Sequence, residues 1–278
     1  MTLTLAATPL GNPGDASPRL KAAIESAEVI AAEDSRRFHR LASDLGVTFT
    51  AKIISFFDGN ETARTQEVLA LLQAGKRVLV VSDAGMPTIS DPGFRLTRDA
   101  IALNLPIVVI PGPSAPTMAL ALSGLATDRF TFEGFLSRSA GARQSHLESL
   151  RFEERTMIFF EAPHRITECL TDAVETFGGD RRAAICREMT KTYEETVRGT
   201  LSELLAWSTS KEILGEITMV IAGVPVGSAA KTAEEMVTRV REFESAGMDR
   251  KDAIATVAKE FDLPKKVVYA AVVDASKS

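Results

Sequence analysis

The sequence predicts an α/β protein with two sheet-containing domains and a small helical appendage. Over the first 115 residues, short apolar runs alternate with helical stretches, which is typical of a parallel sheet flanked by helices. A second set of strand-like runs follows, and the segments after residue 227 are compatible with helices. We therefore predict a parallel-sheet domain over 1–115, a mixed-sheet domain over 116–226 and a helical appendage over 227–278.

The first domain is predicted from apolar runs without polar alternation, as expected of strands buried on both faces. Helical stretches separate these runs. Pro18 stands at a favourable first helical position of one stretch, and Gly75 lies just beyond the end of another. The predicted strands span residues 3–7, 29–32, 52–56, 78–81 and 107–110, and the predicted helices span residues 17–27, 61–73 and 94–103.

The second domain is predicted to contain a mixed sheet. The segment between Glu188 and Glu195 is too short for a crossover helix, so the strands on either side of it should pair antiparallel. A cofactor cleft is expected where this domain meets the first. The strand-like runs cover residues 129–135, 156–160, 183–188, 195–199 and 217–222.

The appendage begins with a predicted linker at 227–230 and continues with helical patterns at 232–244, 249–260 and 263–273. Asp249 is a favourable N-cap residue. The break between the last two helices resembles a helix-turn-helix, which can contact nucleic acid. The appendage has nine basic and nine acidic residues, however, so a packing or dimer-contacting role is at least as well supported.

Three loops rich in glycine and proline directly follow predicted strands, at residues 9–15, 82–93 and 111–115. Parallel sheets place ligands at this end of their strands. Such residues can simply form turns, but three loops that place small residues beside a polar side chain, such as Asp83 or Ser114, predict a shared pocket. Proline lacks the N–H of a phosphate-binding nest, and no G-x-x-x-x-G-K-[ST] motif occurs. Dinucleotide and nucleoside triphosphate binding are therefore disfavoured.

Several of these segments, with others along the chain, resemble a known family. They are ATPLGN at 7–12, AEDSR at 32–36, SDAGMPTISDPG at 82–93, PGPSA at 111–115, FEGFL at 132–136, FEAPHR at 160–165, REMTK at 187–191 and GE at 215–216. They are similar to segments of the ribosomal RNA small subunit methyltransferase I family, which belongs to the tetrapyrrole methylase superfamily. The match is ordered over about residues 3–224. Met86 and Ser35 are mild departures, where many relatives have threonine.

The resemblance implies an enzyme that uses S-adenosylmethionine to methylate the 2′-hydroxyl of a cytidine in the decoding region of 16S rRNA. It also implies a homodimer, which is common in the superfamily, and 16S rRNA within the small ribosomal subunit as the partner. The expected cofactor-binding residues are Pro9, Leu10, Gly11, Asp83, Gly85, Met86, Pro111, Ser114 and Ala115 from the first-domain loops, with Phe160, Met189 and Thr218 from the second domain.

The proton of a ribose hydroxyl must leave as the oxygen attacks, so a base should lie opposite the methyl donor. Glu33 and Asp34 are the best candidates, because the superfamily has a substrate-side acid at the end of this strand. The alternative interpretation of Glu33 is an N-cap or a surface acid. His164 is a second choice of base. The predicted catalytic residues are Glu33, Asp34, Arg36, Arg165 and Lys191, the three basic ones to hold the nucleotide and neutralise charge.

The formal net charge of −5 is unexpected for a protein that binds RNA, because phosphate contacts usually dominate the affinity. The basic residues are clustered, however, around residues 36–40, 138–143 and 181–191. Each cluster can be an ordinary solvated face balanced by nearby acids. Together they permit a local basic track on an acidic protein, which suits recognition of a folded ribosomal surface.

Composition agrees with a soluble cytoplasmic enzyme, at 45% hydrophobic and 25% charged residues. No apolar stretch approaches the roughly 20 residues that span a bilayer, and the N-terminus lacks the basic region of a signal peptide, so no membrane association is expected. Cys169 and Cys186 are expected to be buried thiols rather than a disulfide. Three widely spaced histidines give a metal site little to build on, and none is predicted.

Two alternative functions remain. A methylase of a small molecule such as a tetrapyrrole would share the cofactor and the cleft, but several arginines near the mouth of the cleft suit a largely apolar macrocycle poorly. A non-catalytic adaptor on the ribosome would keep the fold as a scaffold. Tight binding of S-adenosylmethionine would disfavour the adaptor.

Overall fold

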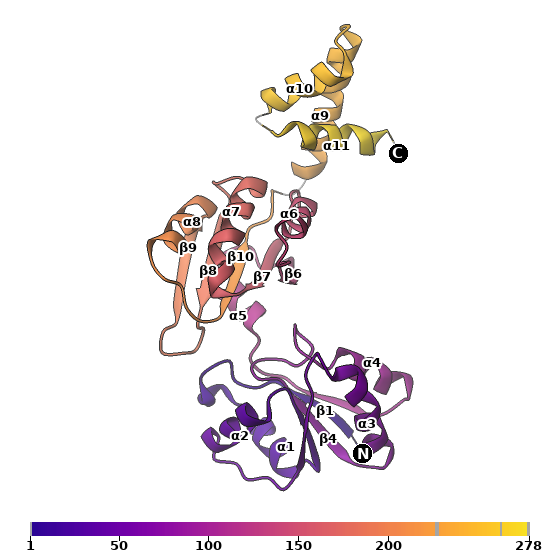
Figure 1. Cartoon of the computed structure of the whole chain (residues 1–278), viewed down its shortest axis with the longest axis vertical. Helices are drawn as coiled ribbons and strands as arrows, with labels where there is room; N and C mark the ends of the chain where they lie inside the picture. The colour runs from indigo at the N-terminus through magenta and orange to yellow at the C-terminus, as the bar shows by residue number, and fades with distance from the viewer. Residues whose placement is uncertain (1, 226–227, 262, 277–278) are drawn as a thin grey trace.

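The computed structural model describes residues 2–225, 228–261 and 263–276. It contains two five-stranded sheets, followed by a cluster of three helices. The three parts follow one another in chain order along the long axis of the molecule (Figure 1). Within the described ranges, none of the helices combines the length and the apolar character needed to cross a membrane.

The first sheet is parallel, with strand order β3-β2-β4-β1-β5. The central strands β2 and β4 are buried along most of their length, which explains why their sequences are continuously apolar. The carboxyl ends of all five strands lie at one edge of the sheet, and the three proline-rich loops leave from there. The strands are β1 (Thr2–Ala6), β2 (Val29–Ala32), β3 (Lys52–Ser55), β4 (Arg77–Val81) and β5 (Ile107–Ile110).

Helices cover both faces of this sheet and form a hydrophobic core on each. Ser17 caps the first helix through its side chain, and Pro18 follows at the first helical position, as predicted. A helix that the sequence analysis did not predict begins directly after β2, where Asp34 is the N-cap. The helices are α1 (Pro18–Ser26), α2 (Ser35–Asp44), α3 (Glu61–Gln73) and α4 (Phe94–Ala102), and a 3₁₀ turn η1 spans Pro13–Asp15.

The second sheet is mixed, with strand order β6-β7-β10-β8-β9. β6 pairs with β7 in parallel, and the other neighbours pair antiparallel, including β8 with β9 across the short connection noted above. Helices α7 and α8 enclose the main core of this domain, and α5 packs on the other face of the sheet. The strands are β6 (Phe130–Phe135), β7 (Thr156–Glu161), β8 (Arg182–Arg187), β9 (Glu195–Thr200) and β10 (Ile217–Ile221); the helices are α5 (Ala115–Ser123), α6 (Ala140–Ser149), η2 (Pro163–Arg165), α7 (Ile166–Phe177) and α8 (Leu201–Ser210).

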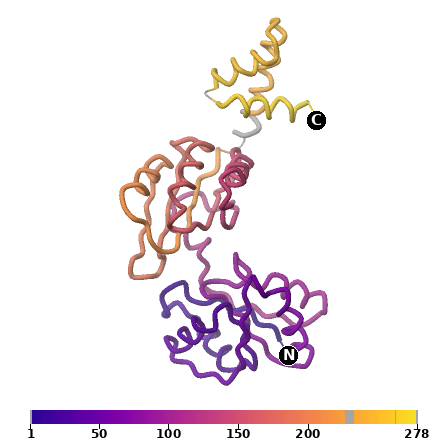
Figure 2. The backbone as a smooth tube through the Cα atoms, in the orientation of Figure 1, coloured from indigo at the N-terminus to yellow at the C-terminus, as the bar shows by residue number. Residues whose placement is uncertain are grey.

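The appendage consists of α9 (Ser228–Ser245), α10 (Arg250–Glu260) and α11 (Lys265–Ala275) around a small core of their own. Phe152 of the second domain packs against this core. Figure 2 shows the appendage at the far end of the molecule from the first domain. α9 begins at Ser228, so the linker predicted at 227–230 is helical from there on, and residue 227 lies outside the described residues.

Candidate functional site

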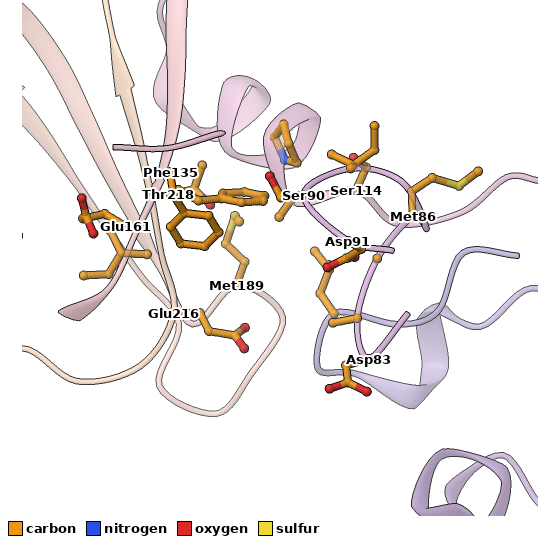
Figure 3. Close-up of a pocket in the computed structure, with 18 of the residues that line it drawn as sticks. Asp83, Met86, Ser90, Asp91, Ser114, Phe135, Glu161, Met189, Glu216 and Thr218 are labelled. Carbon is orange, nitrogen blue, oxygen red and sulfur yellow. The ribbon is translucent and has the colours of Figure 1, made fainter. Parts of the chain in front are cut away.

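A cavity of about 490 Å³ lies where the strand-end loops of the first sheet face the second domain. Its volume is in the usual range for a site that encloses a small molecule. Figure 3 shows Phe135, Met189 and Thr218 on the side of the second domain, opposite Asp83 and Asp91 of the loop after β4. Because the loops after β1, β2, β4 and β5 all contribute, the cavity collects residues far apart in the sequence.

Most of the predicted cofactor-binding residues line this cavity. Pro9, Gly11 and Pro111 do not: Pro9 is buried, and Gly11 lies against the side chain of Lys191. Those that line it are Leu10, Asp83, Gly85, Met86, Ser114, Ala115, Phe160, Met189 and Thr218.

The predicted catalytic residues are distributed differently. Glu33 lines the cavity, whereas Asp34, Arg36, Arg165 and Lys191 do not. The Oδ1 atom of Asp34 accepts hydrogen bonds from the backbone N–H groups of Arg36 and Arg37, and its Oδ2 atom pairs with Arg36 Nη2 at 2.8 Å. Hydrogen bonds from Arg36 hold the pKa of Asp34 well below its usual range. Asp34 therefore acts as the cap of α2, which fixes the chain just beyond Glu33.

Arg165 lies beside the cavity and is nearly buried. Its Nη2 atom donates to the carbonyl oxygens of Leu136 (2.9 Å) and Ser137 (2.8 Å) and lies 3.5 Å from Glu161 Oε2. Glu161 lines the cavity and also accepts hydrogen bonds from the Ala162 N–H and the Cys169 thiol. Arg165 thus joins the carboxyl ends of β6 and β7.

Lys191 is anchored at the edge of the second domain. Its ammonium group lies 2.9 Å from Glu188 Oε1 and 2.9 Å from Glu216 Oε2. Burial lowers its pKa, but these two ion pairs outweigh burial and raise it overall. Nearby, the Asn12 N–H of the first domain donates to Thr190 Oγ1 at 3.2 Å. This exposed hydrogen bond connects the two domains beside the cavity.

Three carboxyl groups face the cavity from the first domain, those of Glu33, Asp83 and Asp91. Glu33 Oε2 accepts a hydrogen bond from the Asp83 N–H (3.1 Å), and Asp83 Oδ1 accepts one from the Asp34 N–H (3.1 Å). Asp83 also pairs with Arg37 Nη1 at 3.2 Å. These bonds lock the ends of β2 and β4 together. Burial raises the pKa of Glu33 and of Asp83.

Asp91 is the functional candidate that the sequence analysis missed. Burial, reinforced by the negative charge of Glu33, raises its pKa to about 7. The loop reaches this position through positive φ angles at Thr88 (79°) and Ser90 (60°), which are uncommon for residues with side chains and are frequent at functional sites. Asp91 stands in the segment that carried the family resemblance, but its sequence gives no indication that the loop folds back into the cavity.

Glu61, at the start of α3, holds the far end of this loop. Its side chain is 9% exposed. The Oε1 atom accepts hydrogen bonds from the backbone N–H groups of Gly93 (3.0 Å) and Arg95 (3.1 Å). One buried carboxylate therefore satisfies two amides at the beginning of α4 and keeps the loop against the sheet.

The wall on the side of the second domain is apolar and aromatic. Phe135 and Phe160 approach with their ring centroids 5.5 Å apart, and Phe135 is 57% exposed. Ser114 stands at the N-cap of α5 without a side-chain capping bond, so its hydroxyl can donate to a ligand. An aromatic wall opposite carboxylates suits a molecule with a flat base and a positive charge, as S-adenosylmethionine has. The further lining residues not predicted from sequence are Arg37, Ala84, Ile89, Ser90, Pro116, Ala162, Pro163, Gly215, Glu216 and Ile217.

The described part of the chain shows no arrangement of side chains typical of a metal centre. Among those residues, no group of three or more histidine, cysteine, aspartate or glutamate side chains is arranged to hold an ion. Cys169 and Cys186 are both buried and unpaired with each other.

Solved structures with the same fold have low sequence identity to this chain. Uroporphyrin-III C-methyl transferase from Thermus thermophilus, complexed with S-adenyl homocysteine, aligns with a TM-score of 0.56 at 13% identity, over 83% of this chain and 99% of that one. Diphthine synthase aligns with a TM-score of 0.58 at 16% identity, over 80% of this chain and 90% of that one. These likenesses confirm the predicted two-domain α/β fold.

Sequence comparisons define the family. The model of the Tetrapyrrole (Corrin/Porphyrin) Methylases matches residues 2–205. The ribosomal RNA small subunit methyltransferase I of Mycobacterium tuberculosis is 50% identical over 92% of this chain and 88% of its own length. The protein of the same name from Synechocystis is 42% identical over 96% and 95%. The chain therefore belongs to the ribosomal RNA small subunit methyltransferase I family, a branch of the tetrapyrrole methylases that depends on S-adenosylmethionine.

Proposed function

We propose that this chain transfers a methyl group from S-adenosylmethionine to the 2′-hydroxyl of a cytidine in the decoding region of 16S rRNA. Family membership supports the reaction and the rRNA substrate. The observation that carries the proposal is the cavity itself, which sets an aromatic wall from the second domain opposite Glu33, Asp83 and Asp91 from the first.

The cavity residues suit S-adenosylmethionine, which supplies an electrophilic methyl group on a positively charged sulfur. Phe160 and Met189 offer apolar surface to the adenine, and the hydroxyl of Ser114 can hydrogen-bond its polar groups. Asp83 offers negative charge to the positive end of the molecule. Positioning donor and acceptor together can supply much of the acceleration of such a transfer.

Proton removal from the ribose hydroxyl is assigned to the neighbouring carboxyls of Glu33 and Asp91. Glu33 already accepts a hydrogen bond from the Asp83 N–H, which fixes its orientation. Asp91 has a pKa of about 7, and a base is most effective when its pKa lies near the working pH. Burial is the main cause of the raised pKa of Asp91, and the negative charge of Glu33 raises it further.

The nucleotide is held by basic residues at the rim of the cavity. Arg37 lines the cavity with its side chain 65% exposed, and Arg36 stands beside it at 90%. Both are on the first turn of α2 and can reach phosphate groups. Arg165 and Lys191 are much less exposed, at 12% and 28%, and are held by protein groups, so they support the shape and charge of the site from behind.

The decisive experiment compares rRNA nucleosides from cells with and without this chain by mass spectrometry. Loss of one 2′-O-methylcytidine from 16S rRNA, restored by the purified enzyme with S-adenosylmethionine and small subunits, is the expected result. Restoration on naked 16S rRNA as well would extend the substrate to free RNA. Unchanged ribose methylation in the deletion strain would refute the proposal.

The two alternative functions make different predictions in the same assay. A tetrapyrrole methylase would leave rRNA unchanged, and it would not require the exposed arginines Arg36 and Arg37 at the mouth of the cavity. A ribosome-binding adaptor would bind small subunits without binding S-adenosylmethionine. Calorimetry should instead find one cofactor site per chain, and that site should be lost on Asp83→Ala combined with Ser114→Trp.

A further inference from the structure

The appendage contains a recess of about 500 Å³ between the first turns of α10 and α11. Four cationic side chains and one tyrosine surround it, with Ile254 beneath them. Tyr269 is 60% exposed although it is large and apolar. We call this surface the basic recess; it is lined by Asp249, Arg250, Lys251, Ile254, Lys265, Lys266 and Tyr269.

The three lysines of the basic recess have no ionic partner among the residues that the structure describes: Lys251, Lys265 and Lys266 take part in none of the ion pairs there. Arg250 lies 3.7 Å from Glu244, so its charge is partly balanced. The one acid of the recess, Asp249, is engaged as the N-cap of α10, where its Oδ2 atom accepts the Lys251 N–H at 3.0 Å.

The appendage separates its charges, although they are equal in number in the sequence. Four of its nine acids lie on α9, and three of them, Glu234, Glu235 and Glu242, line a second hollow. Arg239 in that hollow is neutralised by ion pairs with Glu242 and Glu260. The basic recess gathers four of the nine basic residues of the appendage around a single acid, which overall composition conceals.

We propose that the basic recess binds the RNA substrate at a second place, with its lysines on phosphates and the Tyr269 ring stacked on an unpaired base. This inference rests on the proposed function. Pro264 caps α11 without a side-chain hydrogen bond, so the first N–H groups of this helix, at Lys265 and Lys266, add to the attraction for phosphate. An exposed aromatic ring beside lysines is the usual combination for single-stranded RNA.

The recess lies in the part of the molecule farthest from the first domain, so it cannot touch the reacting ribose (Figure 1). It should contribute to the affinity for the substrate and leave the chemical step alone. Its loss should therefore raise KM and leave kcat unchanged. The residues are exposed, so replacing them should not disturb the core of the appendage.

The test uses the full chain with Lys265→Ala and Lys266→Ala together, and Tyr269→Ala separately. Methyl transfer to purified small subunits and binding to small subunits and to naked 16S rRNA are measured at several salt concentrations. The matched control is Arg241→Ala with Lys259→Ala, which removes two exposed cations of the appendage outside the recess. Lys265→Arg with Lys266→Arg and Tyr269→Phe serve as conservative variants.

The double lysine variant is expected to raise KM by roughly tenfold and to reduce the slope of log affinity against log salt by about 1 to 2, because each lost phosphate contact removes about 0.7 to 0.9. Tyr269→Ala should raise KM without changing the slope, and the conservative variants should retain wild-type binding. Wild-type KM and slope in the double variant would overturn the inference. So would loss of binding to subunits with unchanged binding to naked rRNA, which would indicate a protein contact. Absence of methyl transfer by the wild type would instead refute the proposed function.

Discussion

Asp91 is the carboxyl group of the cavity whose ionisation changes most around neutral pH. Its pKa is about 7, so it is mainly protonated at pH 6 and mainly ionised at pH 8. If it accepts the ribose proton, single-turnover methyl transfer should rise about tenfold per pH unit below pH 7 and level off above it. Asp91→Asn should lower the rate and abolish this dependence. An unchanged pH profile in Asp91→Asn, with Asp44→Asn as a surface control, would exclude Asp91 as the base.

Glu33 should contribute to the same step. Glu33→Gln keeps the size of the side chain and an oxygen for the Asp83 N–H, but it removes the charge. Methyl transfer to small subunits should fall by roughly 10²-fold or more while cofactor binding is retained. Glu28→Gln, at the opposite end of β2, is the matched control. A small loss in Glu33→Gln would mean that positioning dominates and that water takes the proton.

The sequence predicted which loops line the cavity, but it did not predict the course that each loop takes. Leu10, Asp83 and Ser114 were predicted because they follow the ends of strands, and the apolar pattern of a sequence marks where a buried strand ends. Asp91 reaches the cavity because its loop turns at residues with positive φ. Phe135 reaches it because the second domain, formed by a later part of the chain, packs opposite the loops of the first. Such placements depend on contacts between distant segments, so local pattern does not predict them.

Among the elements, the loop between β4 and α4 depends most clearly on a distant support. Glu61→Ala would leave the N–H groups of Gly93 and Arg95 without their acceptor. We expect a loss of about 2 kcal/mol in the free energy of unfolding, since an unsatisfied buried donor costs about 1 to 3 kcal/mol. Cofactor affinity should fall as well, because the loop carries Asp83 and Asp91. Urea denaturation and calorimetry measure the two effects.

The controls for this prediction lie on the same helix. Glu61→Gln keeps an accepting oxygen and should lose less stability than Glu61→Ala. Glu67→Ala removes a partly exposed carboxylate of α3 that pairs with Arg64 and Lys52, and it should cost little stability and leave cofactor affinity unchanged. Equal stability of Glu61→Ala and Glu67→Ala would show that Glu61 does not hold the loop.

The elements of the first sheet could be predicted because β2 and β4 are buried on both faces and are therefore apolar throughout. The helix α2 escaped prediction for the opposite reason. It fully buries only Phe38 and Ala42 and is otherwise polar and rich in arginine. The signals available in the sequence were the helical spacing of Phe38, Leu41 and Ala42 and the N-cap at Asp34. The same side chain was interpreted as a candidate base.

For the whole molecule, we predict a homodimer. β5 is an edge strand of the first sheet, and it exposes Val108 (40%) and Val109 (46%). Ile101 of α4, the helix that precedes β5, is 62% exposed. Unprotected apolar edges favour pairing with another chain. Light scattering at micromolar concentration should give twice the chain mass of 29.9 kDa. Val108→Lys should shift the mass toward the monomer, whereas Phe130→Lys on the edge strand β6 should not. A monomeric wild type would refute the dimer.

The confirmed fold class was predicted from three features: the alternation of strands and helices over residues 1–115, the short connection between Glu188 and Glu195, and the helical patterns after residue 227. The charge separation of the appendage could not be predicted, because its nine basic and nine acidic residues are sorted only when three helices pack. A balanced composition therefore says little about the potential of any one face.

The walls of the cavity belong to two bodies with separate cores, joined beside it by the exposed hydrogen bond between Asn12 and Thr190. A cofactor bound in the cavity contacts both bodies and therefore couples their unfolding. Without the cofactor, each body can unfold at its own temperature. A cofactor present at 100 times its Kd adds about 2.7 kcal/mol to the free energy of unfolding of the state that binds it, which is the one with both bodies folded. Calorimetric scans should therefore show two thermal transitions that merge into one as S-adenosylhomocysteine is added, and a single transition at every concentration would mean that the bodies are already coupled.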